Sequence, residues 1–82
     1  MKITSPEQLA QALKNARKDL NLTQQAAADL VGIKQATVST LENNPRGSRL
    51  NTFFKLLAAL NLELKLAERG SFEEESGWDQ EW

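Results

Sequence analysis

The segment Thr23–Asn43 reads TQQAAADLVGIKQATVSTLEN, and its pattern decides the fold. It holds two short stretches with apolar residues at helical spacing, joined at Gly32. Thr23 is a suitable N-cap for a first helix over Gln24–Val31, and glycine is the residue that most readily ends a helix with a positive φ. A second helix is expected over Gln35–Asn43.

Two helices joined by so tight a turn cross steeply, and the sequence meets the demands of that crossing. Ala28, the fifth residue counted from Gln24, is small where the second helix passes over the first. Gly32, the ninth, gives the turn its positive φ. The apolar residues spaced to bury the inner faces are Ala27, Val31, Ile33, Val38 and Leu41. The segment is therefore predicted to form a helix-turn-helix.

Further helices are expected on both sides of this segment. Ser5 and Pro6 are typical of a helix start, and a helix is predicted over about residues 6–19. Its inward face is expected to carry Leu9, Ala12, Leu13, Ala16 and Leu20. Turn-forming residues at 43–48 predict a loop, and a fourth helix follows over about 51–60. Its side chains expected to point largely inward are Phe53, Phe54, Leu56, Leu57 and Leu60.

After Asn61 the apolar spacing changes from helical to alternating. Leu62, Leu64 and Leu66 alternate with polar or small residues over 62–67, which is typical of a short strand with one apolar face. The alternative is that this stretch extends the fourth helix. Since no second strand is evident, the strand interpretation predicts pairing with the same strand of a second copy, and hence a homodimer.

Composition excludes several classes of function. The 82 residues contain no Cys and no His, which removes disulfides, Cys/His zinc sites and histidine acid–base chemistry. The carboxylates are isolated on helices or bunched near residue 75, so we expect no enzyme, no cofactor and no metal. The first residues lack the apolar run of a secretion signal, and no stretch is long enough to cross a membrane. A cytoplasmic protein is expected.

Charge divides the chain into two parts. Residues 1–69 carry ten basic and six acidic side chains, whereas residues 70–82 carry five acids and no base. We expect 1–69 to form one folded domain, with the helix-turn-helix at 23–43 and the dimer strand at 62–67, and 70–82 to be an acidic, disordered tail. This tail is either a passive solubility segment or, through Trp78 and Trp82, an anchor for a partner protein.

The polar outer face of the second helix indicates DNA binding. Gln35 can pair with adenine and Lys34 with guanine, while Ala36 can touch a thymine methyl and Ser39 is ambiguous. The alternative is a merely solvated helix face. A complete helix-turn-helix pattern behind these residues favours base reading in the major groove.

A second set of residues is expected to contact the DNA backbone. Helix N-termini commonly meet phosphates, and the loop after the recognition helix brings polar and basic side chains to the same surface. The predicted backbone contacts are Gln24, Thr37, Thr40, Asn44, Arg46, Ser48 and Arg49. Arg17 and Lys18 of the first helix are further candidates.

The helix-turn-helix residues resemble those of the lambda-repressor-like (Xre) family. The resemblance is carried by residues 22–28, by Gly32–Ser39 and by Glu42-Asn43. It implies a mainly α, lambda-repressor-like DNA-binding domain of about four helices that reads double-stranded operator DNA. It also implies base reading by Lys34, Gln35, Ala36 and Ser39.

A narrower resemblance is to the HipB-like antitoxins of this family. It is carried by residues 33–37, 42–45 and 52–55, by the alternating leucines and by Glu81-Trp82, whereas residues 46–48 and most of the tail depart from the pattern. The resemblance implies an autorepressor and antitoxin that neutralises a HipA-like serine/threonine kinase toxin, bound in part through Trp82. The alternatives are a stand-alone Xre-type, phage-like repressor and a protein-interaction adaptor that has lost DNA binding.

Overall fold

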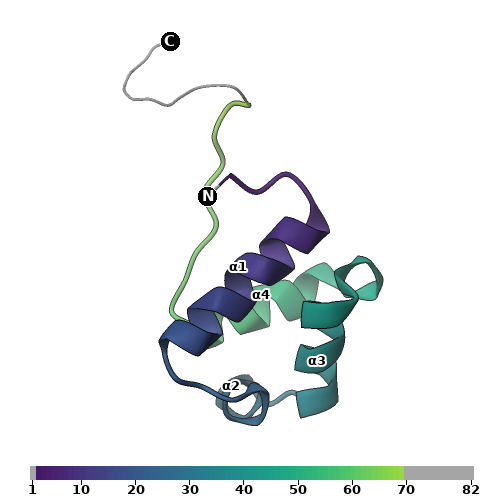
Figure 1. The fold of residues 1–82 in the computed structure, drawn as a ribbon, viewed down its shortest axis with the longest axis vertical. Coiled ribbons are helices and arrows are strands. Elements are labelled where there is room, and N and C mark those ends of the chain that lie inside the picture. Colours follow the sequence, from purple (N-terminus) through teal and green to yellow (C-terminus); the bar gives the residue numbers. More distant parts are fainter. Residues whose placement is uncertain (1, 70–82) are drawn as a thin grey trace.

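The helices of the computed structural model, which describes residues 2–69, lie almost where the sequence predicts them. Figure 1 shows α1 crossing the front of the domain, α2 at its base, α3 along one side and α4 behind α1. The elements are α1 (Pro6–Asp19), α2 (Gln24–Val31), α3 (Gln35–Asn43), the short 3-10 helix η1 (Pro45–Gly47) and α4 (Leu50–Ala59). The predicted acidic tail, including Trp78 and Trp82, lies outside the described residues.

Local hydrogen bonds determine where the first two helices begin. The Ser5 hydroxyl accepts from the Gln8 N–H at 3.2 Å, and the Thr23 hydroxyl accepts from the Ala26 N–H at 3.0 Å. Each bond satisfies one of the N–H groups that a helix start leaves without an intrahelical partner. Gly32 ends α2 with a φ of 69°. The predicted caps and the glycine turn are confirmed.

The helices meet around one apolar core. Ala28 and Val38 are fully buried, so the small residue predicted at the crossing of α2 and α3 does lie inside it. Val31 and Ile33 are half-buried at the edge of the core. The buried apolar residues are Ala10, Leu13, Ala27, Ala28, Val38, Leu41, Phe53, Leu56, Leu57 and Leu60.

Two predicted core positions are wrong. Phe54 is 51% exposed, because α4 turns Phe53 and Leu57 toward the core and leaves Phe54 on its outer side. Leu20 is 52% exposed, because it caps the end of α1 beyond the last turn that meets the core. On α1 the position one turn earlier, Arg17, is the buried one.

The α4 helix ends at Ala59, so the alternative that residues 62–66 extend this helix is wrong. Asn61 adopts a positive φ of 58°, and the Leu62 N–H donates to the Leu57 carbonyl at 2.8 Å, which closes the helix end. In the single chain, residues 62–68 have no regular secondary structure and no strand partner within 2–69. Pairing with a second copy stays a prediction.

No helix in the described part of the chain combines the length and the apolar character needed to cross a membrane.

Candidate nucleic-acid interface

The second helix of the helix-turn-helix, α3, presents its polar side chains outward. Val38 and Leu41 are fully buried and set the rotation of the helix. As a result Gln35 and Ala36 are exposed at its start, and Lys34 is exposed at its N-cap, where it makes no capping bond. Ser39 is half-buried one turn further on, and its hydroxyl accepts from the Asn43 amide at 3.2 Å. The four predicted base-reading residues therefore lie on one end of one helix.

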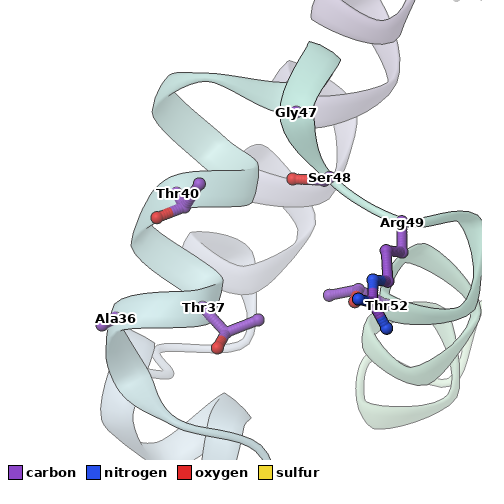
Figure 2. A pocket seen from close by; sticks show the side chains of 7 residues that line it. All are labelled: Ala36, Thr37, Thr40, Gly47, Ser48, Arg49 and Thr52. Carbon is purple, nitrogen blue, oxygen red and sulfur yellow. The ribbon is translucent and has the colours of Figure 1, made fainter.

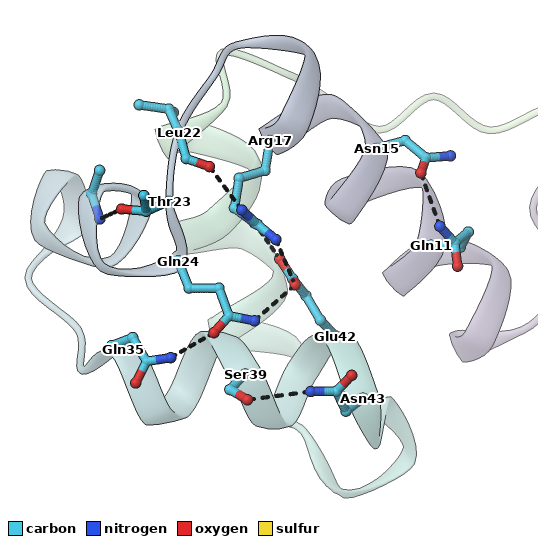
Figure 3. Close-up of polar contacts among 11 residues, drawn as sticks. Gln11, Asn15, Arg17, Leu22, Thr23, Gln24, Gln35, Ser39, Glu42 and Asn43 are labelled. Atoms are coloured by element: carbon cyan, nitrogen blue, oxygen red, sulfur yellow. Dashed lines mark hydrogen bonds and ion pairs between the residues drawn. The ribbon is translucent and has the colours of Figure 1, made fainter.

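Gln35 is held by a hydrogen bond to the start of α2. Its Nε2 donates to Gln24 Oε1 at 2.5 Å, and Gln24 Nε2 donates in turn to Glu42 Oε1 at 3.0 Å (Figure 3). Gln24 is half-buried and Gln35 exposed. The structure thus links a predicted base-reading residue to a predicted backbone contact through a direct amide pair.

Beneath this pair lies an ion pair between α1 and α3. Arg17 Nε lies 2.7 Å from Glu42 Oε2 and Arg17 Nη2 lies 3.1 Å from Glu42 Oε1, a two-point contact. Arg17 Nη1 also donates to the Leu22 carbonyl at 2.7 Å, just before α2. The two side chains are 9% and 1% exposed. Arg17 is therefore a structural residue of the interior, and its assignment as a DNA contact is wrong, whereas Lys18 is exposed.

Glu42 keeps its charge in this setting. Burial raises the pKa of the Glu42 carboxyl, but the hydrogen bonds from Arg17 and Gln24 and the positive charges of Arg17 and Lys14 together lower it further than burial raises it. Its pKa lies below the ordinary value of 4.5. At neutral pH Glu42 is a carboxylate, which accepts hydrogen bonds and donates none.

A hollow between α3 and the start of α4 gathers the predicted backbone contacts. Figure 2 shows hydroxyl side chains from both sides of this hollow, with Arg49 and Thr52 on the α4 side. The lining residues are Ala36, Thr37, Thr40, Gly47, Ser48, Arg49 and Thr52. Four of the predicted backbone contacts are among them, and Thr52 is a residue that the sequence reasoning missed. Hydroxyl and guanidinium donors of this kind suit a phosphate group.

Arg46 lies apart from this hollow. Its guanidinium pairs with Glu7 of α1, with Arg46 Nε 2.6 Å from Glu7 Oε2. The side chains of this pair are 68% and 52% exposed, so the pair is open to solvent. Asn44, also predicted as a backbone contact, is exposed between α3 and η1. The structure therefore brings together only part of the predicted backbone set.

A second surface of the domain is apolar. Leu62 and Leu64 are each 44% exposed, and Leu66 is fully exposed. Leucine side chains in water lose the free energy that burial would supply, about 1.5–3 kcal/mol each. This is the surface that the sequence predicts for a dimer.

Two crossed helices with an exposed polar second helix define a helix-turn-helix protein, and the family described as helix-turn-helix matches residues 13–66. Relatives over nearly the whole chain are two proteins named Antitoxin HipB. The one from Escherichia coli O6:H1 (strain CFT073) is 47% identical, covering 99% of this chain and 88% of the relative. The one from Escherichia coli K12 is 46% identical, covering 99% and 94%.

Solved structures agree with these relatives. A HipA–HipB–O2–O3 complex and a complex of HipB with an O4 20-mer each match with a TM-score of 0.82 and 48% identity, over 84% of this chain and 97% of the other. The chain belongs to the HipB-like antitoxins of the helix-turn-helix family.

Proposed function

We propose that the chain is a transcriptional autorepressor and antitoxin, which binds operator DNA as a homodimer and neutralises a HipA-like serine/threonine kinase toxin. The observation that carries this proposal is the end of α3, where Lys34, Gln35 and Ala36 are exposed to base edges in a chain of the HipB fold. A HipB structure with 48% identity to this chain is a complex with HipA and O2–O3.

In this proposal α3 lies in the major groove of each half-site. Lys34, Gln35, Ala36 and Ser39 contact bases, and the hydroxyl-lined hollow with Arg49 contacts a phosphate. Gln24, Asn44 and Arg46 supply further backbone contacts, for which Arg46 leaves Glu7. With ten basic against six acidic side chains in residues 1–69, one copy attracts DNA only modestly. Binding therefore depends on two half-sites and weakens steeply with salt.

Replacing Gln35 by alanine tests the base-reading role. We expect Gln35→Ala to weaken operator binding by about 1–3 kcal/mol and to relax the preference at one base pair per half-site, because one base loses its partner. Fluorescence anisotropy with operator and random duplexes measures both effects. Gln11→Ala is the matched control, since Gln11 is an exposed glutamine of α1 whose side chain donates to Asn15 on the same helix. Equal weakening on both duplexes would remove Gln35 from the base-reading set.

Toxin binding is proposed for the tail, with Trp82 and Trp78 as the anchoring side chains. Deleting residues 77–82 should weaken toxin binding by roughly thirtyfold, since a buried interface tryptophan commonly contributes about 2 kcal/mol or more. Operator affinity should stay within about twofold, because the helix-turn-helix is intact. Calorimetry with the kinase-like product of the neighbouring gene measures the first effect. An unchanged toxin affinity would contradict the role of the two tryptophans, and an absent interaction with full-length chain would favour a stand-alone repressor.

We further propose that the chain acts by binding alone, without catalysis, and in the cytoplasm, where operator DNA is found. The buried Arg17–Glu42 pair, in which Arg17 donates to both carboxylate oxygens, serves the structure of the domain and supports this mode of action.

A further inference from the structure

Three side chains connect the interior of the domain to the recognition surface, which is the exposed start of α3 with Lys34, Gln35 and Ala36. Glu42 near the end of α3 accepts from Gln24 at the start of α2, and Gln24 accepts from Gln35 at the start of α3 (Figure 3). The Gln24 amide has one NH2 end and one oxygen end, and each end makes one of these bonds. The end that bonds Glu42 therefore decides which end faces Gln35.

Glu42 determines the first direction, because a carboxylate offers acceptors alone. Gln24 must turn its Nε2 toward Glu42, at 3.0 Å, and is left with its Oε1 toward Gln35. Gln35 must then donate from its Nε2. Arg17, which donates to both Glu42 oxygens, holds the carboxylate in place, and the Glu42 side chain is 1% exposed.

The remaining groups of Gln35 are its Oε1 and its second N–H, one acceptor and one donor. Adenine presents a donor at N6 and an acceptor at N7 in the major groove, which matches this pair. Guanine presents acceptors at both O6 and N7, so it leaves the Gln35 oxygen facing another oxygen. The opposite bond direction would turn the Gln35 NH2 group outward and favour guanine.

We propose that Glu42 is a specificity-positioning residue, which makes Gln35 select adenine over guanine by fixing the direction of the bonds from Gln35 through Gln24. The inference rests on the proposed function, in which Gln35 reads a base. It assigns a share of sequence preference to a buried residue that does not itself reach the DNA.

The substitution Glu42→Gln should release the direction of both bonds. The new amide has one oxygen, but Arg17 donates at both Glu42 oxygen positions, so one Arg17 donor meets the NH2 group in either orientation. When that NH2 group occupies the Oε1 position, Gln24 turns its oxygen toward it, and Gln35 presents its own NH2 group to the DNA. The adenine-to-guanine affinity ratio should therefore fall severalfold.

The experiment uses a duplex that the full chain selects from a randomised library. The base pair at which Gln35→Ala loses its preference marks the Gln35 contact. Fluorescence anisotropy then measures the affinity for duplexes with adenine or guanine at that position. The measurements are made at about pH 8, where Glu42 is ionised. Gln24→Met, which leaves the Arg17–Glu42 ion pair in place, should also lower the ratio severalfold, because Gln35 can then rotate freely. If circular dichroism shows that Glu42→Gln does not fold, the adenine-to-guanine ratio of Gln24→Met tests the inference in its place.

Leu13→Ala is the matched control, because Leu13 is 1% exposed in α1 and lies outside the hydrogen-bond chain. It should reduce stability and leave the ratio unchanged. A wild-type ratio in both Glu42→Gln and Gln24→Met, or selection of guanine by the wild-type chain at the Gln35 contact, would overturn the inference. If the chain selects no duplex, or Gln35→Ala changes no base preference, the proposed function itself fails.

Discussion

The polar face of α3 and the leucine segment at 62–66 differ in whether their side chains find partners within the chain. Gln35 on α3 bonds Gln24, which bonds the Glu42 carboxylate of the buried ion pair with Arg17, so the polar face is organised within one chain. The leucine segment has no strand partner within residues 2–69, Leu62 and Leu64 are each 44% exposed, and Leu66 is fully exposed. A surface that reads DNA can be complete in one copy, whereas a strand with an apolar face needs a second one.

The largest expected effect concerns the ion pair beneath the recognition surface. Arg17→Met should lower the free energy of unfolding by about 3 kcal/mol, because it leaves the Glu42 carboxylate buried without its cation. Urea denaturation followed by circular dichroism measures the loss. Arg46→Met is the matched control and should change stability undetectably, since its pair with Glu7 is open to water. Similar losses of unfolding free energy in the two variants would show that the buried Arg17–Glu42 pair stabilises the domain no more than the exposed Arg46–Glu7 pair.

The leucine segment is tested by a charge placed on its apolar face. Leu64→Asp should weaken the homodimer by roughly hundredfold, because two leucines per dimer lose their burial at about 1.5 kcal/mol each. Light scattering after gel filtration should then report a monomer. Ala67→Asp puts the same charge on the alternate face of the predicted strand and should leave the dimer intact. A dimeric Leu64→Asp variant would place the interface elsewhere on the domain.

The smallest effect is the pH dependence that Glu42 brings to the recognition surface. Its pKa in the folded chain lies below the ordinary 4.5, so the unfolded chain takes up the proton first as the pH falls. The stability from Glu42 is therefore full above 4.5 and is lost as the pH falls through the lower, folded-state pKa.

Denaturation at about pH 6 and about pH 3 compares the wild type with Glu42→Gln. The wild type should lose more stability on acidification, because only it carries the titrating carboxyl at this position. Glu7, whose pKa is also lowered, by a backbone hydrogen bond and by Arg46, is present in both chains and cancels in the comparison. Equal losses of stability in the two chains would show that protonation of Glu42 does not affect the stability of the domain.

The sequence predicted the helices well because their ends depend on residues three or four positions apart. Ser5, Thr23 and Gly32 act on neighbouring backbone groups, and these are the positions where the predicted boundaries match those observed. Even α4 differs by a single residue at each end. The outward face of α3 was predictable for the same reason, since the apolar spacing within α3 determines which side chains point outward, and its role in base reading stays a prediction.

By itself, then, the sequence determined the elements, the helix-turn-helix and the family, all of which follow from short-range pattern. Only the tertiary structure decided which charged side chains are buried and which bond each other. Arg17 and Glu42 are 25 positions apart, Arg46 and Glu7 are 39 apart, and the amide pair of Gln24 and Gln35 bridges two helices. Such contacts depend on how each helix is rotated against its neighbours, and that rotation is set by the packing of the whole core.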